Sequence, residues 1–433
     1  MDAIIIASLA IIGMFILIML HVPIGLAMAT VGVIAFGLMS SFKASFSLLA
    51  TEMVTTISSV DMSVVPLFLL MGSFANAAGI SRDLYNLAYA LVGRWRGGLA
   101  MSTVGACGLF GAVCGSSFAT TATFGRVALP EMLKRGYAPT LATGCIAGGG
   151  TLGSLVPPSI VMIIYAIMAE QYIIELFIAA IVPAAITILL YCLAIGIYVR
   201  IYPAAGPAGD RVSALGLLEI AIKAWSSIFL LVAIAVGIYG GVFTVTEAAA
   251  LGAILAFLLA VFRRKMNLRV FWESLTDTAT NSAMIYMIIV GAYVLNYFIV
   301  LTHMPDVVAT GVLDSGWPTT LIFIVLLCVY IILGSVFDTI ASMIITLPFV
   351  LPLIEGMGYS PIWWGIINVV VIEIGLITPP IGINVYVLHG VAKDFQLSTI
   401  FKGTIPFLFA DFVRLALLMI FPVLSLWLPK VFG

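Results

Sequence analysis

Charge is scarce in this sequence of 433 residues: only 9% of them are Asp, Glu, Lys or Arg, and the net charge is −1. An ordinary soluble domain carries about 25% charged residues. Hydrophobic residues make up 63% of the chain, and apolar runs that can cross a bilayer core of about 30 Å recur along it, at 3–20, 22–39, 178–199, 228–262 and 321–333. The composition predicts an all-α polytopic membrane protein, surrounded by the lipid bilayer and without a soluble domain. A net charge this close to zero argues against nucleic acid as a partner.

Motifs for enzymatic chemistry are also missing. The chain has no G-x-x-x-x-G-K-[ST] nucleotide loop, no H-E-x-x-H metal motif and no recognisable nucleophile–base pair. Its five cysteines and three histidines lack metal-ligand spacing. The N-terminal apolar run lacks a basic region and a cleavage site, so we expect a retained first helix rather than a signal peptide. We therefore predict a protein that is not an enzyme and uses no organic cofactor.

The sequence contains an internal repeat. A pattern of Leu-Pro, Gly-Tyr-x-Pro, Gly and Pro-Pro occurs twice, and adding 222 to each position of the first copy gives the second copy without gaps. The matching positions are 129–130 with 351–352, 136–139 with 358–361, 153 with 375, and 157–158 with 379–380. Two apolar halves interrupted at matching places are typical of secondary transporters whose site lies at the repeat interface. We predict a first repeat over residues 1–202, a linker over 203–219 and a second repeat over 220–433.

Each repeat is predicted to hold scaffold helices, a re-entrant helical hairpin and a Gly/Pro-broken helix. The predicted hairpins cover 112–135 and 334–358, and the predicted broken helices cover 138–170 and 361–392. Basic residues gather in three loops, at 94–96, 134–135 and 263–265, which the positive-inside rule places in the cytoplasm. The end of the second hairpin has no Lys or Arg, as expected if it enters the bilayer from the opposite side. The repeats are therefore predicted to be inverted.

The predicted hairpin tips are rich in small, oxygen-bearing residues. The first tip reads GAVCGSSFATTAT over 111–123, and neutral oxygens suit a hard cation such as Na⁺. An oxygen-rich tip recurs at 338–342, where Asp338 is an ionisable residue in an apolar run and so marks a functional site by default. Two alternatives stay open: Ser and Thr also let helices pack closely, and Asp338 also suits a water-exposed helix cap.

Each predicted broken helix contains a Pro-Pro pair after a glycine-containing stretch. Such a pair removes two backbone donors and restricts the preceding residue, so the helix cannot continue through it. Freed carbonyls at membrane depth suit a cation where protein or a water-filled cavity surrounds them. We predict that the turns at 153–156 and 375–378 face the hairpin tip of their own half and form two cation sites. A simple proline kink is the rival interpretation, but it does not explain the repetition.

A few charges are isolated in apolar sequence. Arg126 follows the first tip, and a cation there either meets a carboxylate substrate, pairs within the protein or reaches the surface. Glu247, Glu373, Asp411 and Arg414 are similarly isolated, and for these four we favour structural pairing.

These motifs resemble those of the large membrane (M) subunit of tripartite ATP-independent periplasmic (TRAP) transporters. They are GSSFATTAT, GRVALPEMLKRGYAP and GGGTLGSLVPPSIVMIIYAI in the first half, and FTVTEAAALGAI, VFDTIASMIITLPFVLP and GLITPPIGINVYVL in the second. The resemblance covers nearly the whole chain. It implies an elevator-type transporter in the bacterial inner membrane, in which a transport domain with both hairpins and both broken helices slides against a scaffold. It also implies two partners, a small four-helix membrane subunit and a periplasmic substrate-binding protein.

Carried over residue by residue, the resemblance implies two sets of ligands. Two or more Na⁺ ions would be held by Gly115, Ser116, Ser117, Thr120, Gly150, Thr151, Gly153, Val156, Asp338, Thr339, Ser342, Gly375, Ile377 and Thr378. A small organic anion would contact Thr121, Arg126, Pro157, Pro158, Pro379 and Asn384. The implied function is sodium-coupled symport of an organic anion, a carboxylate such as a dicarboxylate or an acidic sugar such as a sialic acid, delivered by the binding protein.

Three other functions are weighed against this one. A stand-alone sodium/anion symporter without a binding protein leaves no distinguishing motif, so it stays open. The related divalent-anion/sodium symporters share the hairpin architecture, but their Ser-Asn-Thr tips are absent here. A channel predicts rings of like residues or a continuous polar stripe, and the sequence has neither.

Overall fold

The computed structural model describes residues 3–209 and 213–432, and every regular element in these two ranges is a helix. The predicted all-α membrane class is confirmed. Within the described residues, seven helices are long and apolar enough to span a membrane, or up to nine if each of two bent pairs is one span. The elements up to residue 205 are α1 (Ala3–Met19), α2 (Ile24–Met39), α3 (Phe42–Ser58), η1 (Asp61–Ser63), α4 (Val64–Ala78), α5 (Ile80–Val92), α6 (Gly98–Cys114), α7 (Ser117–Val127), α8 (Leu129–Lys134), α9 (Pro139–Leu155), α10 (Ile160–Met168), α11 (Ile173–Ile201) and η2 (Pro203–Ala205). The remaining helices are α12 (Ala214–Lys223), α13 (Trp225–Tyr239), α14 (Val245–Phe262), α15 (Leu268–Leu301), α16 (Met304–Leu313), α17 (Thr319–Val336), α18 (Thr339–Gly356), α19 (Pro361–Leu376), α20 (Ile383–Val391), α21 (Leu397–Ile420) and α22 (Val423–Phe432).

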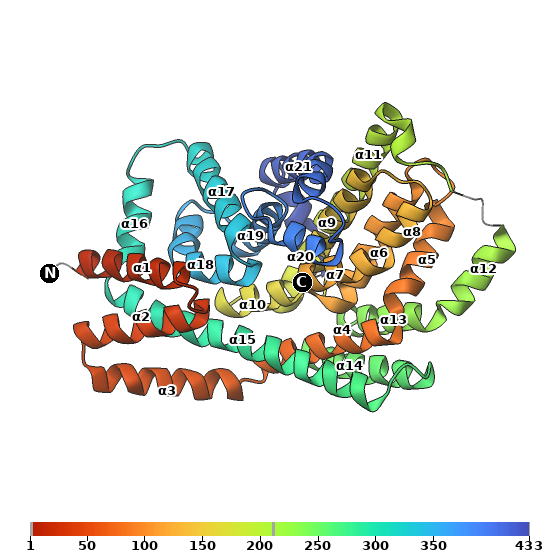
Figure 1. The fold of residues 1–433 in the computed structure, drawn as a ribbon. Helices are drawn as coiled ribbons and strands as arrows, with labels where there is room; N and C mark the ends of the chain where they lie inside the picture. The colour runs from red at the N-terminus through yellow and green to blue at the C-terminus, as the bar shows by residue number, and fades with distance from the viewer. Residues whose placement is uncertain (1–2, 210–212, 433) are drawn as a thin grey trace.

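The helices form two groups (Figure 1). In the lower group of that view, the long helix α15 packs against α2, α3 and α4, and α14 packs along α4. In the upper group, α9 packs against α6, α7 and α21, and α19 packs against α17 and α18. Every residue of α9 from Leu141 to Leu155 and of α19 from Trp363 to Leu376 is buried. Helices that are apolar on all sides belong in the interior, so α9 and α19 form the core of the upper group.

The helix bounds refine the predicted hairpins and broken helices. The first hairpin consists of α6 and α7–α8, so its first limb begins at Gly98, before the predicted start at 112. The second hairpin consists of α17 and α18, and its first limb begins at Thr319, before the predicted 334. Both limbs are uniformly apolar, so the sequence marks the polar tips but not where the limbs begin. The helix pair α9–α10 bends by 41° at its break.

The predicted linker at 203–219 is partly helical. It contains η2, and its last residues belong to α12, whose first turn is capped by the side chain of Ser213 accepting from Gly216 N at 3.1 Å. Residues 210–212 of this predicted linker lie outside the described residues.

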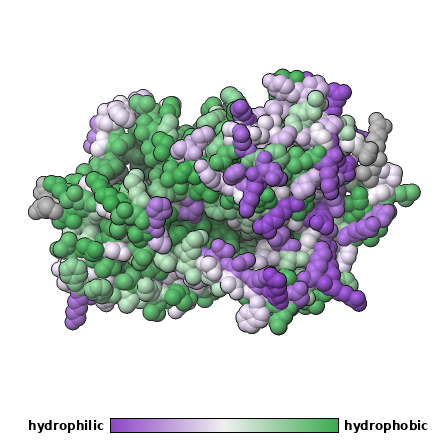
Figure 2. Space-filling model, viewed as in Figure 1, coloured by the Kyte–Doolittle hydropathy of each residue, from purple (hydrophilic) through white to green (hydrophobic). Residues whose placement is uncertain are grey.

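The three basic loops gather at one end of the molecule, around α5. Arg263 Nη1 lies 2.6 Å from Asp83 Oδ2, and Arg135 Nη1 donates to Tyr89 Oη at 2.5 Å, while residues 94–96 directly follow α5. Figure 2 shows hydrophilic residues concentrated over this end, where α5, α8 and α12 lie in Figure 1. The open end of the second hairpin, where α18 ends, lies at the opposite end of the molecule, and Gly356 there faces Leu313 of α16.

Candidate functional site

The first hairpin tip is built by a sharp turn between two helices. Helix α6 ends at Cys114, and Gly115 adopts φ +64°, a conformation that favours glycine. Ser116 then caps α7, its hydroxyl accepting from Ala119 N at 3.4 Å. This tip touches the break in α9–α10, because Ile160 N donates to Gly115 O at 3.4 Å. A Cβ at Gly153 would stand 2.5 Å from Ser116 O, so only glycine lets α9 approach this closely.

The second tip makes the corresponding contacts with different residues. Helix α17 ends at Val336, and Asp338 is the N-cap of α18. Gly382 N, at the end of the break in α19–α20, donates to Ser335 O at 3.0 Å. A Cβ at Gly375 would stand 2.6 Å from the carbonyl carbon of Gly334. Each tip therefore lies against the broken helix of its own half, as the sequence predicts.

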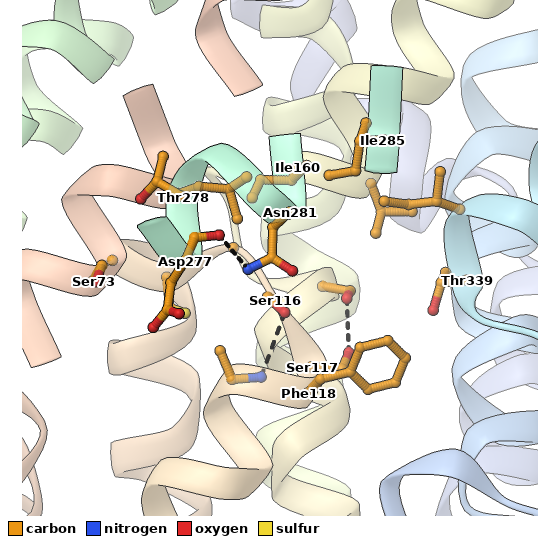
Figure 3. A pocket seen from close by; sticks show the side chains of 18 of the residues that line it. Ser73, Ser116, Ser117, Phe118, Ile160, Asp277, Thr278, Asn281, Ile285 and Thr339 are labelled. Carbon is orange, nitrogen blue, oxygen red and sulfur yellow. Dashed lines mark hydrogen bonds between the residues drawn. The ribbon is translucent and has the colours of Figure 1, made fainter. Parts of the chain in front are cut away.

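A cavity of about 330 Å³ lies between the two tips and the lower helix group. Its polar lining comes from α4 (Ser73, Asn76), the first tip (Ser116, Ser117, Thr123), α9 (Ser154), α15 (Asp277, Thr278, Asn281) and the second tip (Asp338, Thr339). Figure 3 shows Asp277 and Asn281 opposite Ser116 and Ser117, with Thr339 at the side. Of the predicted cation ligands, this cavity is lined by Gly115, Ser116, Ser117, Asp338 and Thr339.

Sequence reasoning missed the wall formed by α4 and α15. Asp277 and Asn281 are four residues apart and so share one face of α15, a polar pair inside an apolar helix. This spacing was a usable signal, because polar groups within a membrane span face the protein interior or a cavity. Asn281 Nδ2 donates to Asp277 O at 2.8 Å.

Glu373 on α19 joins the two tips through hydrogen bonds. Its Oε2 accepts from Ser117 Oγ at 2.6 Å, and its Oε1 accepts from Thr339 Oγ1 at 3.0 Å. Ser117 Oγ also lies 2.7 Å from Ser154 Oγ. Glu373 is 1% exposed. The sequence favours structural pairing for Glu373, and its hydrogen-bond partners in the described chain are hydroxyl groups from both halves.

The other isolated charges have structural partners. Arg414 Nη2 lies 2.8 Å from Asp411 Oδ1 in α21, and both side chains are buried. The Tyr191 hydroxyl lies 2.9 Å from both carboxylate oxygens of Asp411 and donates its hydrogen bond to them. Glu247 forms a capping box with Thr244 at the start of α14. Structural pairing is therefore confirmed for these three residues.

Several predicted cation ligands have hydroxyls that are already engaged. Thr120 donates to Ser116 O at 2.8 Å, Thr151 donates to Gly148 O at 2.7 Å and Thr378 donates to Ile374 O at 2.6 Å. Each bond lies within one helix or at its end, so these hydroxyls contribute at most an oxygen lone pair. Gly150 and Gly153 form the face of α9 that receives α7, and a Cβ at Gly150 would overlap the hydroxyl of Thr121. These two glycines therefore let α7 pack closely against α9.

Two predicted residues at the breaks are helix ends. Val156 is the C-cap of α9 and Ile377 is the C-cap of α19. The Ile377 carbonyl accepts from Thr404 Oγ1 at 3.3 Å. Helix C-termini carry partial negative charge, which suits a nearby cation.

Two buried hydroxyls fit a cation better, because nothing in the described chain satisfies them. Ser342 Oγ on α18 and Thr121 Oγ1 on α7 are buried without a hydrogen-bond partner among the described residues. Buried polar atoms are normally satisfied, so these two oxygens, like other unpartnered buried polar atoms of the described residues such as those of Asn368, are open to an ion or a water molecule. The described residues contain no group of three or more His, Cys, Asp or Glu that could hold a metal ion, so the donors on offer are mainly neutral oxygens, the set predicted for Na⁺.

The predicted substrate contacts are scattered. Arg126 lines a second cavity of about 340 Å³ beside α5, together with Arg82, Tyr85, Asn86 and Lys134. Pro157 and Pro158 are buried at the first break, whereas Pro379 is exposed at the second. Asn384 on α20 is buried with both amide atoms unpaired among the described residues. None of these five, nor Thr121, lines the central cavity, so the structure does not bring Arg126 to the tips.

Comparisons with known proteins agree with this architecture. Residues 11–424 match the family model described as tripartite ATP-independent periplasmic transporter, DctM component. The C4-dicarboxylate TRAP transporter large permease protein DctM of Pseudomonas aeruginosa is 36% identical over 386 residues, 89% of this chain and 90% of that protein. The sialic acid TRAP transporter large permease protein SiaM of Vibrio cholerae is 29% identical, over 95% of each chain. The crystal structure of the Alcanivorax borkumensis YdaH transporter has a similar fold, with a TM-score of 0.62 at 15% identity over 90% of this chain and 89% of that chain.

Proposed function

Because the chain belongs to the DctM-component family of tripartite ATP-independent periplasmic transporters, we propose that it couples import of an organic anion to sodium. The observation that carries the proposal is the central cavity, which two oxygen-rich hairpin tips close from one side and two helices of the other group close from the opposite side. Relatives named for C4-dicarboxylate and sialic acid support a carboxylate or acidic sugar as the substrate. The chain is a transporter subunit and not an enzyme.

The proposed cation sites lie at the two tips. At the first tip, Gly115, Ser116 and Ser117 with the end of α9 at Val156 supply neutral oxygens. At the second tip the oxygens come from Asp338, Thr339 and Ser342, with the end of α19 nearby. A bound cation would supply positive charge beside the cavity, and the residues of both tips would then present their amide ends to an anion.

The proposed movement is an elevator step. Both tips and both broken helices pack into the upper helix group, and the cavity lies where that group meets α4 and α15. Sliding of one group against the other would carry the cavity across the membrane without opening the upper core, which is buried throughout α9 and α19. Large hydrophobic side chains exposed on α1, α11, α13 and α14 offer surfaces for lipid and for a small membrane subunit.

Sodium gradients supply enough free energy for this cycle. A tenfold gradient gives about 1.4 kcal/mol per ion, and 100 mV gives about 2.3 kcal/mol per charge. Two Na⁺ with one monoanion therefore yield about 5 kcal/mol, which supports accumulation of about 10³- to 10⁴-fold. With a dianion the same two ions yield only about 3 kcal/mol, so a dicarboxylate favours a third ion.

Uptake into proteoliposomes tests the proposal. The chain is reconstituted with its small membrane subunit, and uptake of radiolabelled C4-dicarboxylates and sialic acid is measured with and without an inward Na⁺ gradient and a periplasmic binding protein. We expect uptake to need both, which fits a complex in the bacterial inner membrane. Equal Na⁺ on both sides is the control. Uptake that ignores the binding protein would support the stand-alone symporter, and uptake that ignores the gradient would refute sodium coupling.

A further inference from the structure

Glu373 is an unusual acid among the described residues because it has no ion-pair or hydrogen-bond contact with a cation, although the buried Arg414 acts on its charge at longer range. The formally charged residues that are buried within 3–209 and 213–432 are Glu373, Asp411 and Arg414, and Arg414 is already paired with Asp411 at 2.8 Å. Glu373 instead accepts hydrogen bonds from the hydroxyls of Ser117 and Thr339, and Ser154 is a third hydroxyl partner. A buried carboxylate is costly unless donors and charge compensate it, so its position between the two tips calls for an explanation.

The hydrogen bonds of Glu373 fix which way two hydroxyl groups point. A carboxylate only accepts hydrogen bonds, whereas a hydroxyl has one donor and two acceptor lone pairs. When Glu373 is ionised, Ser117 and Thr339 must therefore direct their protons at its carboxylate. Ser154 Oγ lies 2.7 Å from Ser117 Oγ and also hydrogen-bonds to Glu373, so it belongs to the same group of hydroxyls around this side chain. The lone pairs that remain on Ser117 and Thr339 are free to face the cavity that both residues line.

We propose that Glu373 is a positioning residue that turns Ser117 and Thr339 oxygen-first toward cations at the two tips and couples the two sites to each other. One carboxylate holds Ser117 of the first tip through Oε2 and Thr339 of the second through Oε1. A cation that orders either hydroxyl therefore orders the carboxylate and, through it, the other hydroxyl. Sodium binding at one tip raises the affinity of the other. The inference rests on the proposed sodium coupling.

Replacement with glutamine separates the orienting role from simple space filling. Glutamine has nearly the same shape, but it accepts at one atom and donates at the other. In Glu373→Gln, one of the two hydroxyls must therefore accept from the amide and turn its own proton elsewhere. We expect the sodium concentration at half-saturation to rise about tenfold and the Hill coefficient to fall from about two toward one.

The experiment measures sodium binding, not transport. The full chain with its small subunit is purified in detergent, and thermal stabilisation by NaCl is titrated at constant ionic strength with choline chloride. Glu355→Gln, an exposed glutamate on α18, is the matched control. If the wild type gains no stability from sodium, the proposed function fails. If the wild type responds and Glu373→Gln keeps both the wild-type midpoint and Hill coefficient, the positioning role fails while the function stands.

A second set of variants keeps the test decisive if Glu373→Gln does not fold. Thr339→Ser keeps the hydroxyl and should bind sodium like the wild type, whereas Thr339→Val and Ser117→Ala should each lower the Hill coefficient toward one. Combined, Ser117→Ala and Thr339→Val should raise the midpoint by less than the product of their single effects, because each alone already breaks the link. Independent, multiplicative effects would overturn the proposed coupling.

Discussion

The first and second hairpin tips face the same cavity with different chemistry. At the first tip, Gly115 turns the chain at φ +64° and Ser116 caps the next helix, so the tip carries no charge. At the second tip, Phe337 and Asp338 make the turn with negative φ values, and the cap is a carboxylate. The two halves thus reach one geometry, with the tip packed on its own broken helix, from different residues.

The breaks beside the tips differ in exposure as well. Pro157 and Pro158 are buried, whereas Pro379 and Pro380 are exposed. The charged cap thus stands in the half whose break is exposed, and the neutral cap stands in the half whose break is buried. We expect the second site to bind its cation mainly by charge and the first mainly by the number and placement of neutral oxygens.

The largest effect is expected from removing the charge at the second tip. Two unit charges 4 Å apart interact by about 4 kcal/mol at an effective dielectric constant of 20. Asp338→Asn should therefore raise the sodium concentration for half-maximal uptake by at least about 100-fold, measured in proteoliposomes. Asp314→Asn, an exposed residue at the end of α16, is the control and should leave it unchanged. A wild-type sodium dependence in Asp338→Asn would exclude a cation at this tip.

Adding a methyl group where each tip meets its broken helix should have the next largest effect. In Gly153→Ala the new Cβ would meet Ser116 O at 2.5 Å, and in Gly375→Ala it would meet the backbone of Gly334 at 2.6 Å. Each variant should lose about 1–3 kcal/mol of stability and most of its uptake, measured by thermal unfolding and transport assay. Gly105→Ala in α6 is the control, because nothing lies within 4 Å of its Cβ position. If Gly153→Ala and Gly375→Ala matched Gly105→Ala in both assays, the close approach of each tip to its broken helix would not be needed for stability or transport.

Sequence could predict those features of the fold that depend on short local motifs. Gly115, the Pro-Pro pairs and the capping hydroxyls interrupt long apolar stretches, and each interruption coincides with a helix end. The ion pair of Asp411 with Arg414 was also within reach, since residues three apart share a helix face.

What sequence could not supply was the pairing of distant elements. The α15 wall of the cavity lies more than 100 residues from the first tip along the chain, and Glu373 meets Ser117 across 256 residues. Nothing local distinguishes a carboxylate that bonds hydroxyls from one that pairs with a cation. For the same reason Arg126 was assigned to the substrate by its charge alone, although α7 turns it toward α5.

A smaller effect is expected from Ser116→Ala at the neutral tip. The variant loses a helix cap, worth about 1 kcal/mol, and one of several neutral oxygens, so sodium half-saturation should rise about tenfold, less than in Asp338→Asn. Ser41→Ala, which removes the cap of α3 with its 3.2 Å bond to Ala44 N, is the matched control for stability. If Ser116→Ala and Ser41→Ala showed the same sodium dependence, Ser116 would be a helix cap and not a cation ligand.

The smallest effect should come from Arg126→Gln, which compares the central cavity with the second one. Arg126 is exposed and lies among Arg82, Asn86 and Lys134, with no place in the lining between the tips. Sodium half-saturation should therefore stay within about twofold of the wild type, and the apparent affinity for the anion should change by less than about threefold, since an exposed charge contributes about 1 kcal/mol or less. Arg200→Gln, exposed in the last turn of α11, controls for loss of surface charge. A tenfold weaker apparent affinity for the anion in Arg126→Gln alone would mean that the anion meets this arginine in the cycle, and that the central cavity does not account for its binding alone.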